Sequence, residues 1–256
     1  MARIFITGSA DGLGRMAAQQ LVASGHDVVL HARNRERARQ AIEAVPGARD
    51  TLIGDLSSMV ETRALAELAN NAGPFDAVIH NAGIGLIESR LETVDRLERV
   101  FAINVLAPYL LTALIEQPHR LVYLSSGMHR GGDPDITDLQ WRRRRWNAAQ
   151  AYSDSKLFDV ALAFAIARLW PRTLSNAVDP GWVATKMGGP NAPDDIIQGA
   201  ETQVWLAVSD DPQATVSGRF FHHKRLRESH PAASDLAVQD GLLRACEKLT
   251  GIPLPI

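Results

Sequence analysis

The chain has 256 residues, of which 46% are hydrophobic and 22% charged, enough apolar material for the core of one large globular domain. Its formal net charge of -2 gives no electrostatic reason to expect binding to nucleic acid or to an anionic membrane surface. The single cysteine, Cys246, excludes an internal disulfide, and we find neither a secretory signal pattern nor an apolar run long enough to span a bilayer. We therefore expect one cytoplasmic domain over residues 1–256.

The first half of the chain alternates short apolar runs with helical segments. An apolar run at 3–6 is followed by three glycines, Gly8, Gly12 and Gly14, and by a helical composition at 16–23. Further strands are predicted at 27–30, 51–53 and 76–80, and helices at 35–45 and 61–72.

The second half continues this alternation after a longer helical region. The pattern predicts helices at 93–104 and 108–116, a strand at 120–125, a polar and basic loop to about residue 150, a helix at 152–168, strands at 175–178 and 217–221, and a helix at 236–249. Continuously apolar strands between helices indicate a parallel sheet covered on both faces. We predict a single doubly wound, Rossmann-type α/β domain with about seven mostly parallel strands.

The glycines of Thr7–Gly14 stand at a strand end and a helix start with the spacing G-x-x-x-G-x-G. Small residues at this place let the backbone approach a pyrophosphate at the positive end of the helix. A tight connection that needs only the conformational freedom of glycine is the alternative interpretation.

The end of the second predicted strand is where the two nicotinamide cofactors are distinguished in such folds. Here Arg33 is present and no carboxylate appears before Glu36. Because an arginine pairs with a 2'-phosphate through charge-assisted hydrogen bonds, we predict NADP(H) over NAD(H), with NAD(H) still possible. Arg15 is a second candidate for this phosphate, whereas Asp11 would oppose it.

Tyr152 and Lys156 are four residues apart on a predicted helix and share one face. An ammonium beside a phenol favours the phenolate, so Tyr152 is a candidate general acid/base. A surface contact is the alternative for the pair alone. Asp159, three residues after the lysine, is expected to pair with it on the helix.

Five features in order, TGSADGLG at 7–14, Asp55, Asn81-Ala82-Gly83, Ser126 and YSDSK at 152–156, resemble the short-chain dehydrogenase/reductase family, most closely its retinol-dehydrogenase-like and bacterial ketoreductase branches. The resemblance covers residues 2 to about 250. It implies a catalytic tetrad of Asn104, Ser126, Tyr152 and Lys156. Tyr152 would exchange a proton with the substrate oxygen, Ser126 would polarise the substrate, and Asn104 would hold a water that links Lys156 to solvent.

The resemblance also implies the cofactor contacts. Asp55 would meet the adenine, Asn81 would tie the central sheet together, and Ala82 and Gly83 would flank the adenosine ribose. The complete set of expected cofactor-binding residues is Gly8, Ser9, Asp11, Gly12, Leu13, Gly14, Arg33, Asp55, Leu56, Asn81, Ala82, Gly83, Tyr152, Lys156, Pro180, Gly181, Val183 and Thr185.

The substrate side is less defined by the sequence. The expected pocket-lining residues, besides Ser126, are Met128, His129, Trp182 and Met187, and a Gly- and Pro-rich loop at about 183–200 suits a mobile lid. The run Trp141–Trp146, with four arginines between two tryptophans, is either an entrance for an anionic or aromatic substrate or a solvated face with its tryptophans pinned to the core. We expect no metal at His222-His223, since adjacent residues on a strand point to opposite faces.

These features predict an oxidoreductase that transfers a hydride between NADP(H) and the carbonyl or alcohol carbon of a hydrophobic ketone, aldehyde or secondary alcohol. The alternative is a non-catalytic NADP(H)-binding sensor or scaffold that retains the fold. The family often dimerises through the helices that carry Asn104 and Tyr152, and the long insertion before Tyr152 is placed to obstruct that surface. Both a homodimer and a monomer stay open.

Overall fold

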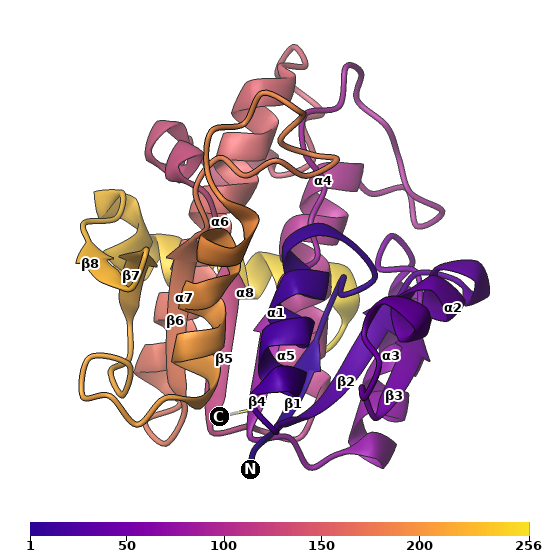
Figure 1. Ribbon diagram of the computed structural model, residues 1–256. Helices are drawn as coiled ribbons and strands as arrows, with labels where there is room; N and C mark the ends of the chain where they lie inside the picture. The colour runs from indigo at the N-terminus through magenta and orange to yellow at the C-terminus, as the bar shows by residue number, and fades with distance from the viewer. Residues whose placement is uncertain (256) are drawn as a thin grey trace.

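A computed structural model describes residues 1–255 and contains one eight-stranded sheet in the order β3-β2-β1-β4-β5-β6-β7-β8 (Figure 1). The strands are β1 (Arg3–Ile6), β2 (Asp27–Ala32), β3 (Asp50–Ile53), β4 (Ala77–His80), β5 (Arg120–Leu124), β6 (Leu174–Asp179), β7 (Arg219–His222) and β8 (Arg225–Arg227). The first seven strands pair in parallel, and β8 pairs antiparallel with β7 at the edge. The predicted doubly wound α/β domain is confirmed, with one strand more than expected.

Helices cover both faces of the sheet. They are α1 (Gly12–Ala23), α2 (Arg35–Ala44), α3 (Met59–Ala72), α4 (Arg99–Phe101), α5 (Ala107–Leu114), α6 (Ala148–Leu169), α7 (Ile196–Val208) and α8 (Leu236–Thr250). A π-helical turn (Ala102–Leu106) joins α4 to α5, and short 3-10 helices lie at Gly127–Gly131, Ile136–Asp138 and Pro231–Ser234.

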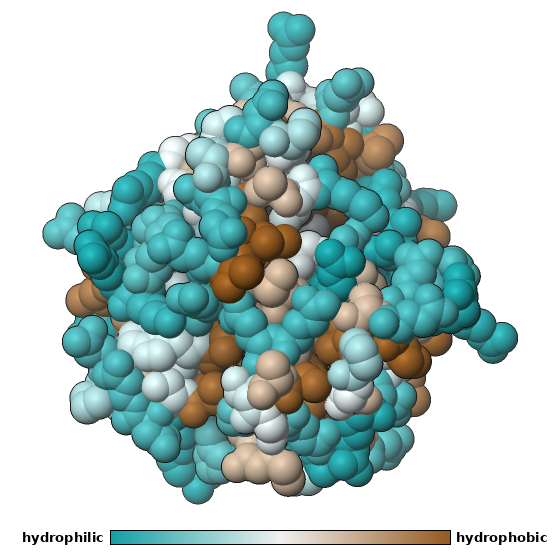
Figure 2. Space-filling view, viewed as in Figure 1, coloured by the Kyte–Doolittle hydropathy of each residue, from teal (hydrophilic) through white to brown (hydrophobic). Residues whose placement is uncertain are grey.

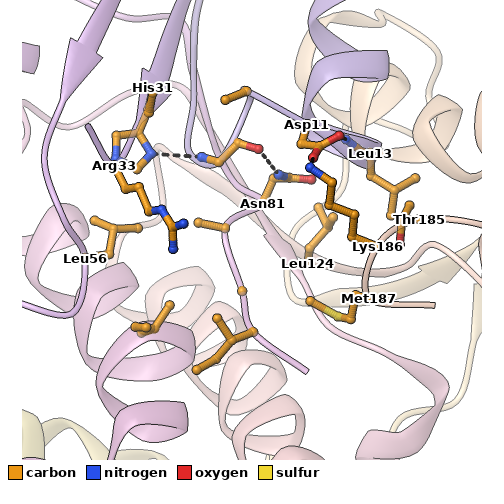
Figure 3. Close-up of a pocket in the computed structure, with 18 of the residues that line it drawn as sticks. Asp11, Leu13, His31, Arg33, Leu56, Asn81, Leu124, Thr185, Lys186 and Met187 are labelled. Carbon is orange, nitrogen blue, oxygen red and sulfur yellow. Dashed lines mark hydrogen bonds and ion pairs between the residues drawn. The ribbon is translucent and has the colours of Figure 1, made fainter. Parts of the chain in front are cut away.

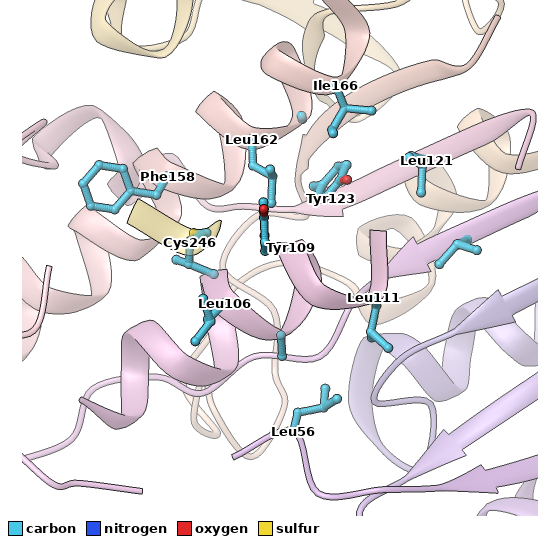
Figure 4. Packing of buried hydrophobic residues seen from close by; sticks show 14 of the residues in the cluster. Leu56, Leu106, Tyr109, Leu111, Leu121, Tyr123, Phe158, Leu162, Ile166 and Cys246 are labelled. Atoms are coloured by element: carbon cyan, nitrogen blue, oxygen red, sulfur yellow. The ribbon is translucent and has the colours of Figure 1, made fainter. Parts of the chain in front are cut away.

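Two apolar clusters fill the space between sheet and helices. In β1, Ile4 and Ile6 point to the cluster under α1 and α7, whereas Phe5 points to the cluster under α3, α5, α6 and α8, because successive strand residues alternate between faces. Figure 4 shows the second cluster, in which Tyr109, Tyr123 and Leu162 come from three elements far apart in the sequence. The outer side of α1 and α7 carries hydrophilic side chains together with a hydrophobic patch near the start of α7, where Ile197 is exposed (Figure 2).

The prediction of a helix over 93–104 was wrong for the first half of that range. It begins at Arg99, after Arg96 adopts a left-handed backbone conformation with φ of 59° that no helix continues. The Glu98 carboxylate then accepts hydrogen bonds from two N–H groups of the first turn. The π-helical turn that follows contains Asn104, and such turns are often found at functional sites.

Two elements have no counterpart in the sequence-based prediction. The helix α7 packs beside α1 and starts at Ile196, after Asp195, whose carboxylate caps two N–H groups of the first turn. The three residues of β8 are exposed and only Leu226 among them is apolar, so the strand lacks the apolar run from which strands are predicted. Among the described residues, none of the helices combines the length and apolarity that crossing a bilayer requires.

Candidate active site

A cleft of about 490 Å³ opens at the carboxyl ends of the central strands. In the sheet order, β1 has β2 on one side and β4 on the other, so the chain reverses its winding direction at β1. Ligands of open α/β sheets bind in the crevice at this switch point. The sequence-predicted residues that line the cleft are Gly8, Asp11, Gly12, Leu13, Arg33, Asp55, Leu56, Asn81, Ala82, Gly83, Tyr152, Lys156, Pro180, Thr185 and Met187. Figure 3 labels seven of them, namely Asp11, Leu13, Arg33, Leu56, Asn81, Thr185 and Met187.

The glycine turn is packed against the strand beside it. A Cβ on Gly8, which has φ of 65°, would lie 2.9 Å from the Ala82 Cα atom, and a Cβ on Gly14 would lie 2.4 Å from the Asn81 Nδ2 atom. The Asn81 side chain donates from Nδ2 to the carbonyls of Thr7 and Gly8. The amide therefore fastens the end of β4 to the turn, and the space it occupies excludes a side chain at Gly14.

His31, which the sequence analysis did not single out, supports the same turn from β2. Its Nδ1 atom accepts from the Gly8 N–H at 2.9 Å, and its Nε2 atom lies 2.8 Å from the Gly54 carbonyl, to which it donates. Burial lowers the pKa of His31, which keeps the ring in this neutral form. The only feature of the sequence that pointed to this role was the position of His31 at the end of a strand.

Cationic side chains dominate the charge of the cleft. Its lining holds five of them, Arg33, Arg37, Arg99, Lys156 and Lys186, against the carboxylates of Asp11 and Asp55. This excess suits an anionic ligand such as a dinucleotide phosphate. Arg37, Arg99 and Lys186 were not predicted, although Arg37 stands four residues after Arg33.

Asp11 is held by two of these cations. Its Oδ2 atom accepts from Arg37 at 3.1 Å and lies 2.5 Å from the Lys186 ammonium, so the loop after β6 is tied to the glycine turn (Figure 3). Burial alone would raise the pKa of Asp11, but hydrogen bonds from Lys186, the Gly12 N–H and Arg37 lower it to about 2. The negative charge that would oppose a phosphate is thereby compensated.

Tyr152 lines the cleft from α6, where Asn147 caps the first turn. Its hydroxyl lies 3.9 Å from the Met187 Sδ atom, and the Lys156 Nζ atom lies 5.8 Å from the centre of its ring. The helix thus places an ammonium beside the phenol, as its i,i+4 spacing predicts.

Lys156 is almost fully buried. Its Nζ atom donates to the Leu124 carbonyl at 2.8 Å and to Asp159 Oδ2 at 2.7 Å, so the expected helical pairing with Asp159 is present. Burial alone would lower the pKa of Lys156, but the charges of Asp159 and Tyr152 outweigh burial and raise it. The lysine therefore stays charged at neutral pH.

The two serines after β5 have different hydrogen bonds. Ser125 lines the cleft, but its hydroxyl donates to the Lys156 carbonyl at 2.8 Å. Ser126 lies just beyond the lining, and its Oγ atom accepts from the Met128 N–H at 3.2 Å. Because Ser126 only accepts in this contact, its hydrogen stays free to be donated to a substrate oxygen.

Asn104 lies behind the lining rather than in it. Its Nδ2 atom donates to the Ile84 carbonyl and to Ser155 Oγ, and its Oδ1 atom accepts from the Ile84 N–H. The side chain thus joins the segment after β4 to α6. A Cβ on Gly83 would lie 3.4 Å from Asn104 Oδ1 and 3.5 Å from Lys156 Nζ, so the backbone at Gly83 runs close beside both groups.

The remaining predicted cofactor residues do not line the cleft. Ser9 is fully buried and donates to the Ile6 carbonyl, and Val183 packs against Gly199 of α7. Gly181, with φ of 88°, leaves no space for a side chain because a Cβ would meet Asp194. These residues shape the walls behind the cleft.

Like Ser126, three of the other four residues expected in a substrate pocket lie outside the cleft lining. His129 is fully buried and packs on Phe220, with Nδ1 2.7 Å from the Ser126 carbonyl. Met128 and Trp182 are exposed at 40% and 59% without contacting the cleft. Met187 alone is placed beside Tyr152.

The Trp141–Trp146 run is anchored to the protein. Trp141 is buried and contacts Trp146 edge to face, and the Arg144 guanidinium lies 4.0 Å from a Trp141 ring. Arg144 also forms ion pairs with Asp133, Asp138 and Asp154, two of which are buried. Of the two alternatives, the structure favours the face with tryptophans pinned to the core.

His222 and His223 do not diverge as expected. The strand β7 ends at His222, and His223 has φ of 49°, so the two rings stack with centroids 3.9 Å apart. Within residues 1–255, no cluster of three or more histidine, cysteine, aspartate or glutamate side chains has a geometry for holding a metal ion.

Known proteins resemble this chain over its full length. A sequence model described as short chain dehydrogenase matches residues 2–128. An uncharacterized oxidoreductase of Emericella nidulans is 46% identical, covering 100% of this chain and 99% of its own, and the short-chain dehydrogenase chyC of Penicillium rubens is 43% identical, covering 100% of both. A Streptomyces protein named as a daunorubicin C-13 ketoreductase, DnrU, is 32% identical over 90% of this chain and 86% of its own.

Among solved structures, an uncharacterized protein from Mycobacterium paratuberculosis superposes with a TM-score of 0.87 at 26% identity, covering 100% of this chain and 96% of that one. The likeness thus extends from sequence to fold. The chain belongs to the short-chain dehydrogenase/reductase family and is an NAD(P)-dependent oxidoreductase.

Proposed function

We propose that this enzyme transfers a hydride between NADP(H) and the carbonyl or alcohol carbon of a hydrophobic ketone, aldehyde or secondary alcohol, with Tyr152 as the general acid/base. The observation that carries the proposal is the Tyr152 phenol beside the buried Lys156 ammonium at the wall of a cationic cleft. The name of the ketoreductase relative supports a ketone as substrate.

The residues of the cleft fit a nicotinamide dinucleotide. The glycine turn leaves backbone next to the cleft at the start of α1, where a pyrophosphate is favoured by the helix dipole. Arg33 is exposed and lines the cleft, and Arg37 lies beside Asp11, which supports the proposal that these two arginines bind a 2'-phosphate. When bound, the cofactor would supply the hydride.

The protein groups handle the proton and the substrate oxygen. In reduction, Tyr152 gives its hydroxyl proton to the carbonyl oxygen, and Ser126 donates a hydrogen bond that stabilises the developing alkoxide. Lys156 holds a positive charge beside the phenol, and Asn104 keeps the backbone after β4 in place next to that lysine. In oxidation the same groups act in reverse.

The loop predicted at about 183–200 ends at Asp195, after which α7 begins, and we propose that this shorter loop acts as a lid. Lys186 joins it to Asp11, and Met187 covers the Tyr152 hydroxyl while reaching Gly85 on the other side of the cleft. These contacts close the loop across the place where the substrate carbonyl must lie. Opening therefore requires the Lys186 ion pair to break, an exposed contact of at most about 1 kcal/mol.

The direct test is oxidation of NADPH with a panel of apolar ketones and aldehydes, comparing wild type with Tyr152→Phe. The phenylalanine keeps the ring and removes the proton donor, so we expect activity to fall by about 10²- to 10⁴-fold while NADPH binding is retained. Full activity in Tyr152→Phe would refute the proposal. NADPH binding with no turnover of any carbonyl or alcohol by wild type would favour the non-catalytic sensor.

The cofactor preference is tested by Arg33→Asp. We expect NADPH binding to weaken by at least about tenfold, because charge-assisted hydrogen bonds contribute about 1.5–3 kcal/mol. Arg35→Asp is the matched control, since Arg35 is exposed at the start of α2 outside the cleft. Equal effects of the two substitutions, or a wild-type preference for NADH, would contradict the assignment.

A further inference from the structure

The Lys156 ammonium has two partners inside the protein. It donates to the Leu124 carbonyl and to the Asp159 carboxylate, at 2.8 and 2.7 Å. Since an ammonium carries three donors, one is left for the cleft, which Lys156 lines. Leu124 and Asp159 thereby fix the direction of this third donor.

Burying the Asp159 carboxylate is unfavourable in free energy. Its side chain is 3% exposed and that of Lys156 is 5% exposed, so both charges have lost almost all contact with water. The neighbouring positions of α6, Leu157, Phe158 and Val160, are apolar and fully or nearly fully buried. An apolar residue in place of Asp159 would suit this segment better, since buried ion pairs are often no more stabilising than apolar packing. The presence of a carboxylate at this position is thus explained by its ion pair with Lys156.

We propose that Asp159 is a positioning residue of the active site, a counter-ion that holds Lys156 against the cleft wall and sets the pH at which the Tyr152 phenol ionises. The inference rests on the proposed role of Tyr152. With Asp159 ionised, the lysine and aspartate together carry no net charge, so the phenol keeps its proton to higher pH than beside an uncompensated ammonium. A protonated phenol is the form that donates to a carbonyl oxygen.

Few other groups titrate near Asp159. Lys156 faces it from the same helix, and the Tyr123 hydroxyl of β5 lies close enough to feel its charge. That hydroxyl is hydrogen-bonded to Thr112 of α5, which also contacts the His80 ring of β4. Burial raises the pKa of Tyr123 and lowers that of His80 to about 3, so both are neutral near pH 7. Burial raises the pKa of Asp159 to about 6, against the opposing charge of Lys156.

The test is a phenolate absorbance titration of the protein without cofactor. The chain has three tyrosines, and burial raises the pKa of Tyr109 and Tyr123, so the absorbance step that is missing from Tyr152→Phe is assigned to the Tyr152 phenolate. We expect Asp159→Asn to move the midpoint down by about one pH unit, the effect of one unit charge at an effective dielectric constant near 20. An unchanged or higher midpoint would overturn the proposal.

Asp154→Asn is the matched control. Asp154 is a buried carboxylate of the same helix, but it pairs with Arg144 and Gln150 rather than with Lys156. Its substitution is expected to leave the midpoint in place. An equal shift in both variants would also overturn the proposal, because it would reflect a general loss of charge from α6.

The rate profile separates positioning from a purely structural role. In Asp159→Asn, the alkaline loss of carbonyl reduction should begin about one pH unit lower, with little change in rate on the acid side, and Asp159→Glu should restore it. A uniform loss at all pH values would indicate damage to the fold and overturn the proposal. If Tyr152→Phe keeps its activity, the proposed function fails, whereas the absorbance midpoint still decides the Asp159 inference.

A stability cycle keeps the inference testable if Asp159→Asn alone does not fold. Lys156→Met leaves the buried carboxylate without a cation and should unfold at lower urea concentration at pH 8 than at pH 5. Adding Asp159→Asn to Lys156→Met should raise the midpoint again at pH 8. A double variant no more stable than Lys156→Met would show that the two side chains do not depend on each other, and would overturn the proposal.

Discussion

Replacing Gly14 with alanine tests whether the glycine turn is held by the Asn81 amide. The added methyl group would lie 2.4 Å from Asn81 Nδ2 and 2.6 Å from the Gly8 carbonyl oxygen, so these groups must move by about 1 Å to reach ordinary contact. The movement gives up the amide hydrogen bonds to Thr7 and Gly8, each contributing about 1 kcal/mol. Overpacking by the methyl group adds about 1–3 kcal/mol to this loss of stability, and the higher helix propensity of alanine offsets about 1 kcal/mol of the loss.

The net expectation for Gly14→Ala is a loss of about 2–4 kcal/mol in the free energy of unfolding, measured by urea denaturation. At this chain length that corresponds to a melting temperature lower by about 4–16 °C. NADPH affinity should fall as well, since the shifted Gly8 peptide lines the cleft. Asn81→Ala in the Gly14→Ala background should recover part of the loss, because it makes room for the methyl group.

Gly131→Ala is the matched control for this substitution. A Cβ on Gly131 meets nothing within 4 Å, so the change should stay within about 0.5 kcal/mol of wild type. If Gly14→Ala proves as stable as Gly131→Ala, the turn tolerates a side chain, and the close packing of Asn81 against it is refuted.

Three further predictions follow from buried charge and from the packing of α6. Burial lowers the pKa of His80 to about 3, so below about pH 6.5 the unfolded state binds a proton that the folded state does not, and the protein loses stability as the pH falls. His80→Gln should remove about 2 kcal/mol of the stability that is lost between pH 7 and pH 5, as measured by urea denaturation at both pH values. Arg144→Met should lower the free energy of unfolding by about 3–5 kcal/mol, since it leaves the buried carboxylates of Asp138 and Asp154 without their cation. The control Arg143→Met, at an exposed position, should change that free energy by less than about 0.5 kcal/mol, and equal melting temperatures of the two variants would contradict the prediction. The chain should sediment as a monomer at micromolar concentration, because its own α8 packs on α6, one of the two helices expected to form a dimer interface; a dimer in sedimentation velocity would contradict this expectation.

The sequence identified the fold class because the strands of a parallel sheet are buried on both faces. The runs at Arg3–Ile6 and Arg120–Leu124 are apolar almost throughout, and such runs are distinct from the mixed composition of helices around them. The edge strand β8 and the helix α7 were missed for the opposite reason. β8 is exposed, and the start of α7 follows directly on a Gly- and Pro-rich loop without a clear break in composition.

The candidate site was predicted most fully where its residues are close in sequence. The spacing of Tyr152 and Lys156 on one helix and the glycines of one turn follow from local geometry. The NADP(H) preference and the catalytic roles stay predictions. His31 and Lys186 were beyond reach, since neither belongs to a local pattern and each meets the glycine turn only after the chain has folded.

By itself the sequence determined the alternation of strands and helices over most of the chain, the turn that opens toward the cleft and the tyrosine–lysine pair, because each depends on residues close together in the chain. The tertiary structure alone decided which charges far apart in the sequence meet and which pairs lose their contact with water. It placed Asp11 between Arg37 and Lys186, and it buried Asp159 beside Lys156 instead of leaving the pair at the surface. Periodicity states which side of a helix faces inward, whereas the strength of an ion pair depends on how much water the surrounding elements remove from it.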